Sequence, residues 1–140
     1  YLARKNNLVT NLGKFLDPIA DKMLVSCALI AIALEPTFLQ IAVAVFSMVI
    51  LCRELMISGF RIVASSKNVI LAADKLGKIK TTLQMIALIL LLPYADIAAL
   101  SDQAGDIVCY IGFAFLALAT VMTVVSGLNY IVKNKEVLKD

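Results

Sequence analysis

The chain has 140 residues, of which 61% are hydrophobic and only 16% are charged, with a mean hydropathy of +0.93 and a formal net charge of +3. This composition excludes an ordinary soluble domain and indicates an integral membrane protein with length for about four spans of roughly 20 residues each. Because the sequence contains no histidine, the commonest general base is missing and histidine-dependent zinc hydrolysis is excluded.

Four apolar segments follow one another along the chain, and each predicts a membrane-spanning helix. They cover residues 16–34, 37–52 with a helical continuation through Arg53 and Arg61, 79–92 with an extension to 100, and 107–132. Pro36 fits a tight turn between the first two segments, and Pro93 ends or kinks the third helix. We therefore expect an all-α, polytopic membrane helix bundle with four transmembrane helices.

The charged residues predict how these helices are oriented. All 13 Lys and Arg residues precede or open the first segment, join the second to the third, or follow the fourth. The charged residues of the other two connections are all acidic, namely Glu35, Asp96, Asp102 and Asp106. By the positive-inside rule the basic side is cytoplasmic, and both ends of the chain lie there.

Four residues inside the apolar segments are expected to have structural roles only. Cys27, Cys52 and Cys109 show neither metal-ligand spacing nor a pairing pattern, so we expect three small buried hydrophobes. Tyr130 stands near the cytoplasmic end of the last segment. We expect it to anchor that helix at the membrane interface.

Asp17 and Asp21 stand at the start of the first apolar segment, where carboxylates are costly and usually pair, line a wet cavity or bind a cation. Four residues apart on a helix, they project from one face and are suited to Mg²⁺ or Mn²⁺. Gly13, one turn earlier, leaves room for a bulky ligand. The alternatives are a solvated first turn and a turn-breaking glycine. Two carboxylates are too few for two metal ions, and the other acids are badly placed.

A cluster of cations is predicted on the same side of the membrane. Arg53 and Arg61 lie eight residues apart on one helix face, and Lys78 and Lys80 open the third helix, where cations oppose the helix dipole. Together they are suited to a phosphate monoester. The alternative for the arginines is snorkelling to lipid headgroups. Glu54 points elsewhere, so we expect it to pair with another helix. Acids beside these cations indicate phosphoryl transfer at a lipid surface.

The acidic stretch also carries a family resemblance. Ala3-Arg4, eight residues, Gly13, three residues, Asp17, three residues and Asp21 resemble the second half of the CDP-alcohol phosphotransferase signature, Asp-x2-Asp-Gly-x2-Ala-Arg-x8-Gly-x3-Asp-x3-Asp. Residues 11–22, 53–61 and 77–85 are similar to blocks of its bacterial phosphatidylglycerophosphate synthase branch. The resemblance covers essentially all 140 residues. It implies that residues 1–140 are the C-terminal part of one six-helix domain, with its third to sixth helices. We expect this stretch alone, without the first two aspartates, to be inactive.

The resemblance implies transfer of a phosphatidyl group from CDP-diacylglycerol to sn-glycerol 3-phosphate, with release of CMP. It implies a divalent cofactor, Mg²⁺ or Mn²⁺, as two ions. The implied roles are metal binding for Asp17 and Asp21, general base for Asp21, CDP-lipid binding for Arg4 and Gly13, and glycerol-phosphate binding for Arg53, Arg61, Lys78 and Lys80.

The same resemblance implies the bacterial cytoplasmic membrane, an active site at its cytoplasmic face, contact with membrane lipids, a homodimer and no nucleic-acid partner. Two alternatives remain open. One is a family member with another acceptor, such as serine, inositol phosphate or the hydroxyl of a second lipid. The other is a cation or proton transporter with Asp17 and Asp21 as a relay, which predicts carboxylates deep in the bundle and no need for the cations. A structural subunit is a further reading that nothing in the sequence favours.

Overall fold

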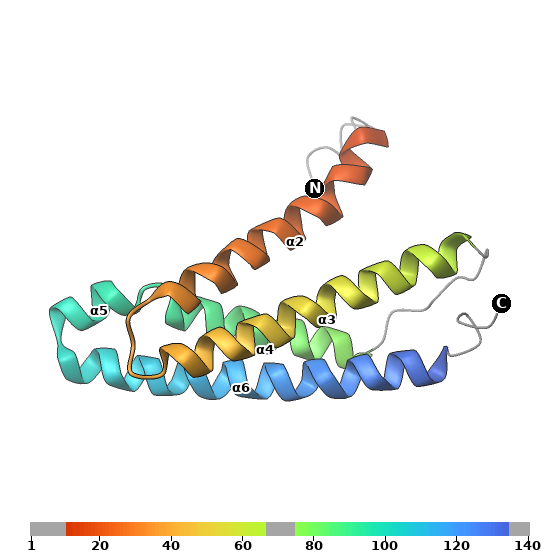
Figure 1. The fold of residues 1–140 in the computed structure, drawn as a ribbon. Helices are drawn as coiled ribbons and strands as arrows, with labels where there is room; N and C mark the ends of the chain where they lie inside the picture. The colour runs from red at the N-terminus through yellow and green to blue at the C-terminus, as the bar shows by residue number, and fades with distance from the viewer. Residues whose placement is uncertain (1–10, 67–74, 135–140) are drawn as a thin grey trace.

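The computed structural model describes residues 11–66 and 75–134, and it is a bundle of long helices (Figure 1). The helices are α2 (Asn11–Leu34), α3 (Gln40–Ser66), α4 (Lys75–Leu91), α5 (Tyr94–Leu100) and α6 (Asp102–Lys133). Helices α3, α4 and α6 run alongside one another, α5 covers one end, and α2 leans away toward the other end. The expected all-α membrane bundle is confirmed.

Three stretches of the described residues are long and apolar enough to cross a membrane: Gln40–Ser65, Leu76–Leu100 and Asp102–Lys133. They match the second, third and fourth predicted segments, and α3 continues through Arg53 and Arg61 without a break. Helix α4 ends just before Pro93, which precedes α5, as proline geometry requires. Helix α2 matches the first segment in position, and its role as a fourth span remains a prediction.

Helix α6 presents a continuous buried seam to the rest of the bundle. Eight of its ten buried residues recur at alternating spacings of four and three, which keeps one helix face toward the neighbouring helices. They are Gly105, Cys109, Gly112, Leu116, Ala119, Thr123, Ser126 and Tyr130. A Cβ atom on Gly112 would lie 2.7 Å from Leu91 Cγ, so glycine allows α4 to approach closely. Small residues of this kind give membrane helices their van der Waals contact.

The apolar core explains why α2 leaves the bundle. The main core joins the C-terminal half of α2, through Leu29 and Ile32, to α3, α4 and α6. A second cluster, centred on Ile57, Phe60 and Tyr130, joins α3 to α6 at the opposite end and contains no residue of α2. The N-terminal half of α2 therefore diverges from α3 beyond the main core (Figure 1).

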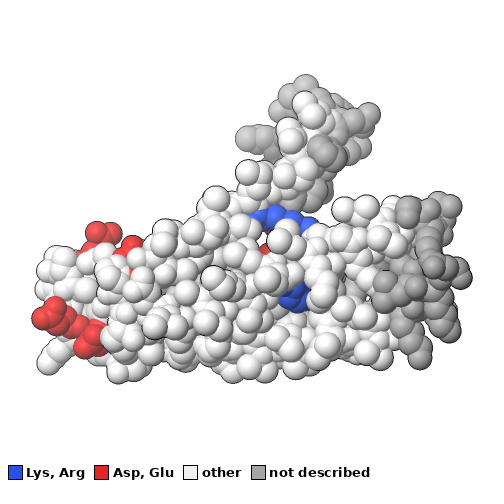
Figure 2. Space-filling view, viewed as in Figure 1, with Lys and Arg blue, Asp and Glu red and all other residues white. Residues whose placement is uncertain are grey.

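The described charges separate along the bundle as predicted. Acidic side chains gather at the end formed by α5, and basic side chains appear beside α2 at the middle of the molecule (Figure 2). The residues at the acidic end come from both predicted outer connections. Acidic and basic side chains of the described residues thus lie apart on this face, and the orientation of the helices in the membrane stays a prediction.

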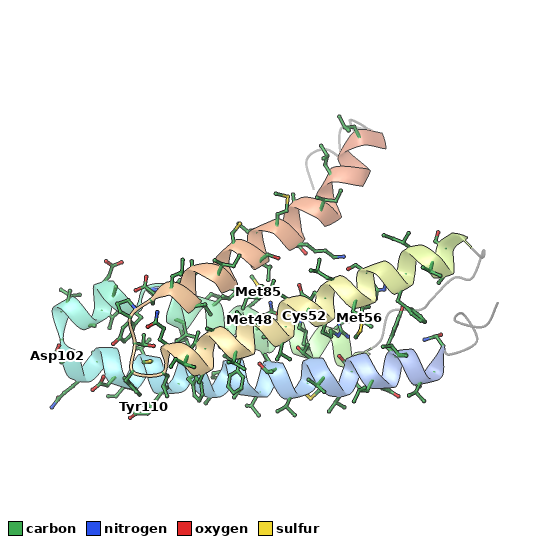
Figure 3. The ribbon with its side chains drawn as sticks, viewed as in Figure 1. Met48, Cys52, Met56, Met85, Asp102 and Tyr110 are labelled. Carbon is green, nitrogen blue, oxygen red and sulfur yellow. The ribbon has the colours of Figure 1, made fainter. Side chains whose placement is uncertain are left out.

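The exposure of the cysteines differs from the expectation that all three are buried. Cys109 is buried, but Cys27 and Cys52 are exposed on α2 and α3. Cys52 lies between Met48 and Met56, which are likewise exposed along α3 (Figure 3). The prediction of burial was wrong for two of three cysteines because an apolar helix face in a membrane can contact lipid instead of a protein core.

Candidate functional site

A pocket of about 520 Å³ lies between α2 and the other helices. Its size is typical of small-molecule sites. Five cations and two carboxylates line it, from three different helices: Asp21 and Lys22 of α2, Arg53, Glu54 and Arg61 of α3, and Lys78 and Lys80 of α4. Such a concentration of charge beside apolar helices indicates a binding site for an anionic ligand.

The pocket brings together five of the eight residues predicted for the site. These five are Asp21, Arg53, Arg61, Lys78 and Lys80. Gly13 and Asp17 belong to α2 and precede Asp21 by two turns and one turn, but the side chain of Asp17 lies outside what the structure describes. Arg4 also lies outside the described residues.

Helix α6 positions Arg53 from below the pocket. Nη2 of Arg53 donates a hydrogen bond to Ser126 Oγ at 2.8 Å. A Cβ atom on Gly127 would lie 3.2 Å from Arg53 Cγ, so glycine gives the arginine stem room against α6. Arg53 is half-buried, and it therefore points into the bundle and not outward to lipid headgroups.

Tyr130 holds the second arginine. Nε of Arg61 donates to the Tyr130 hydroxyl at 3.2 Å, and the guanidinium carbon lies 5.5 Å from the centroid of the ring. Only 3% of Tyr130 is exposed, and its ring packs edge-on against Phe60. The expectation of an interfacial anchor was wrong, because this tyrosine faces the interior of the bundle and lines the pocket.

Sequence reasoning missed Ser126 and Tyr130 as partners of the arginines. The signal was present, because both residues stand four positions apart on the face of α6 that carries the glycines and alanine of the seam. Polar side chains on a buried membrane helix face need hydrogen-bond partners, and the arginines of α3 were available. The sequence does not show that α6 packs against α3, so it does not identify the arginines as the hydrogen-bond partners of Ser126 and Tyr130.

Lys80 and Glu54 form a buried ion pair between α4 and α3. Lys80 is 2% exposed, whereas Lys78 and Arg61 are exposed. The pair confirms that Glu54 serves another helix and that an anion lies near the start of α4. The ammonium of Lys80 is thus already bound to a carboxylate, and Lys78 and Arg61 are the more accessible cations.

A polar contact joins α2 to α3 at the pocket. Lys22 Nζ donates to Ser58 Oγ, and the Ser58 hydroxyl donates in turn to the backbone carbonyl of Glu54 at 2.6 Å. Asp21 precedes Lys22 on α2 and lines the same pocket. The contact therefore ties α2 to α3 beside the residue that carries the carboxylate.

The metal-binding capacity of the described residues is limited. They contain no group of three or more His, Cys, Asp or Glu side chains that could hold a metal ion. Glu54 lies in the pocket but is bound to Lys80. Asp21 is exposed and lines the pocket.

Comparison with known proteins adds a family match. The model of the CDP-alcohol phosphatidyltransferase family matches residues 1–125. A Bacillus subtilis protein named CDP-diacylglycerol–glycerol-3-phosphate 3-phosphatidyltransferase is 46% identical over 144 residues, covering 99% of this chain and 67% of the relative. A Rickettsia bellii protein of the same name is 36% identical over 132 residues, covering 93% of this chain and 67% of the relative.

Proposed function

Because the chain belongs to the CDP-alcohol phosphatidyltransferase family, we propose that it transfers the phosphatidyl group of CDP-diacylglycerol to sn-glycerol 3-phosphate, giving phosphatidylglycerophosphate and CMP. The names of its relatives support this reaction. The observation that carries the proposal is the shared pocket of Asp21, Arg61 and Lys78. An acid that can receive a proton and cations that can hold a phosphate are the two parts that this transfer needs.

The acceptor phosphate binds at the exposed cations of α3 and α4. Arg61 offers a planar fork of donors for phosphate oxygens, and Lys78 adds a compact charge. Tyr130 holds the Arg61 side chain before the ligand arrives, which lowers the entropy lost on binding. Arg53 and Lys80 complete the proposed set from the inner side of the pocket, where Lys80 shares its charge with Glu54.

Asp21 acts as the general base. It accepts the proton of the acceptor's 1-hydroxyl while that oxygen attacks the lipid-side phosphorus. A phosphorus–oxygen bond to glycerol 3-phosphate forms as the bond to CMP breaks, and CMP leaves with the bonding electron pair. Both reactants are oriented in one pocket, so the step is effectively intramolecular.

The family generally uses a divalent metal ion, and Asp17 and Asp21 are the residues of this chain proposed to hold it. Their carboxylate oxygens suit Mg²⁺ or Mn²⁺, and Asp21 lines the pocket. When bound, a metal pair supplies charge neutralisation at the diphosphate. On the donor side, Arg4 binds near that diphosphate and Gly13 leaves clearance for the nucleotide.

We propose the bacterial cytoplasmic membrane as the location, with the pocket at the cytoplasmic face. Five of the described basic residues line the pocket, and the acids gather at the α5 end (Figure 2), which is the asymmetry that the positive-inside rule expects. Residues 1–140 would form the C-terminal part of one membrane domain. A homodimer remains a proposal drawn from the family resemblance.

The test uses the full-length protein that carries this sequence. Arg61→Ala and Lys78→Ala should each raise the KM for glycerol 3-phosphate at least about tenfold, because each removes a charge-assisted phosphate contact. The KM for CDP-diacylglycerol should stay within twofold. Lys133→Ala, at the end of α6 outside the pocket, is the matched control. Equal effects on both substrates would refute this assignment of the acceptor site.

A panel of acceptors separates the alternatives within the family. CMP release with serine, inositol phosphate or a lipid alcohol, but not with glycerol 3-phosphate, would change the substrate and keep the family. The transporter reading predicts no CMP release with any acceptor. The position of Asp21 in a pocket that five cations line disfavours that reading, because a relay needs no such cluster.

A further inference from the structure

Gln84 of α4 is a buried amide that borders the pocket. Only 1% of it is exposed, yet it is one of the residues that line the cavity. Neither its Oε1 nor its Nε2 atom has a hydrogen-bond partner among residues 11–66 and 75–134. A buried amide without partners is costly, and the cost is greatest where the surroundings are apolar.

The position of Gln84 limits what can satisfy it. It follows Lys80 by one turn on the same face of α4, farther into the membrane-spanning part of the helix. The pocket wall carries apolar residues such as Val25 and Ile57 beside its charged and polar ones, and none of the described side chains is hydrogen-bonded to the amide. Lys80 itself is bound to Glu54. Because the amide borders the pocket, a molecule that occupies the pocket, water included, can supply its partner.

The chemistry of the amide selects the kind of partner. Nε2 donates hydrogen bonds and Oε1 accepts them, so one small group that satisfies both must itself donate and accept. A hydroxyl group does both. A phosphate oxygen or an ester carbonyl only accepts, and it would leave Oε1 without a partner.

We propose that Gln84 binds a hydroxyl group of the acceptor alcohol and thereby selects the acceptor. The inference rests on the proposed function. In glycerol 3-phosphate the phosphate is assigned to Arg61 and Lys78, and the 1-hydroxyl is the nucleophile beside Asp21. The group left for Gln84 is the 2-hydroxyl, which makes Gln84 a specificity-determining residue.

The experiment compares two acceptors in the full-length enzyme. One is glycerol 3-phosphate, and the other is 3-hydroxypropyl phosphate, which keeps the phosphate and the nucleophilic hydroxyl but lacks the 2-hydroxyl. The wild type should use the second with a kcat/KM at least about tenfold lower, because the amide would then lose its partner. Gln84→Met keeps the length of the side chain without its hydrogen bonds. It should lower kcat/KM for glycerol 3-phosphate about tenfold and leave the analogue within about twofold.

Ser47→Ala provides the matched control. Ser47 is also buried, and its hydroxyl has no partner in the described part of the chain, but it lies outside the pocket. This variant should keep the wild-type preference between the two acceptors. A purely structural role for Gln84, or a bound water as its partner, predicts that Gln84→Met changes the rates with both acceptors by the same factor or with neither.

Either of those outcomes overturns the inference, and so does a wild type that does not distinguish the two acceptors. A wild type that uses both acceptors equally well overturns the inference even if Gln84→Met does not fold. Absence of CMP release with both acceptors would instead remove the proposed function. Activity with glycerol 3-phosphate and an unchanged preference in Gln84→Met would remove only the role of Gln84.

Discussion

Tyr130 contacts Arg61 in two ways at once, because its hydroxyl accepts a hydrogen bond from Nε at 3.2 Å and its ring lies 5.5 Å from the guanidinium carbon. The hydroxyl fixes the direction of the side chain, and the face of the ring attracts its charge. An uncharged residue of α6 therefore helps to set the position of a cation that α3 presents to the pocket.

Tyr130→Phe tests this contact, because it removes the hydroxyl and keeps the ring. We expect the KM for glycerol 3-phosphate to rise about three- to tenfold, as expected for one lost hydrogen bond to a charged group that is partly exposed. The KM for CDP-diacylglycerol should not change. Steady-state kinetics of the full-length enzyme provide the measurement. Tyr110→Phe at the far end of α6 is the control, and a similar KM change in both variants would contradict the prediction.

The ion pair of Glu54 and Lys80 should contribute to stability in a strongly non-additive way. Glu54→Gln or Lys80→Met leaves one charge buried without its counter-ion and should lower the free energy of unfolding by about 3–5 kcal/mol. Glu54→Leu combined with Lys80→Met should cost much less than the sum of the single changes. Thermal unfolding in detergent micelles measures all three. Additive losses would mean that the two side chains do not act as a pair.

The close approach of α4 to α6 depends on Gly112. Gly112→Ala should lower the free energy of unfolding by about 1–3 kcal/mol, because its Cβ would lie 2.7 Å from Leu91 Cγ. Gly59→Ala is the same substitution in α3 with nothing within 4 Å. It should be neutral or stabilising by up to about 1 kcal/mol. Similar unfolding temperatures for the two variants would show that the contact is not tight.

The carboxylate of Asp21 should be required for metal binding. Asp21→Asn in the full-length protein should weaken Mn²⁺ binding at least about tenfold, since a neutral amide replaces a charged ligand. Electron paramagnetic resonance of Mn²⁺ measures binding without turnover. EDTA should abolish CMP release by the wild type, and added Mg²⁺ should restore it. Asp96→Asn at the acidic end is the control, and unchanged Mn²⁺ affinity in Asp21→Asn would contradict the assignment.

Much of the fold follows from local patterns. Apolar segments bounded by charges and prolines predicted α3, α4 and α6 with small errors at their ends. The prediction works because a chain in lipid must form its backbone hydrogen bonds internally, which favours a helix. The eight-residue spacing of Arg53 and Arg61 correctly predicted that both reach one site. Burial was harder to predict, since lipid accepts apolar residues such as Cys52 as readily as a protein core does.

The partners of the site residues could not be read from spacing. Lys80 was assigned to phosphate, but its closest anion is Glu54, twenty-six positions earlier on another helix. The general preference of tyrosine for membrane interfaces predicts the wrong environment for Tyr130, because that preference does not tell which face of α6 carries the residue. Both outcomes depend on which helix faces pack together, and that is decided by shape over the whole length of α6.

The divergence of α2 from its neighbours places the proposed general base and the acceptor-binding cations on separate parts of the bundle. Asp21 belongs to α2, which joins the main apolar core through its C-terminal half. Arg61, Lys78 and Gln84 belong to α3 and α4, which pack with α6. A substitution in α3 or α4 can therefore change how the acceptor alcohol is held without altering the helix that carries the base.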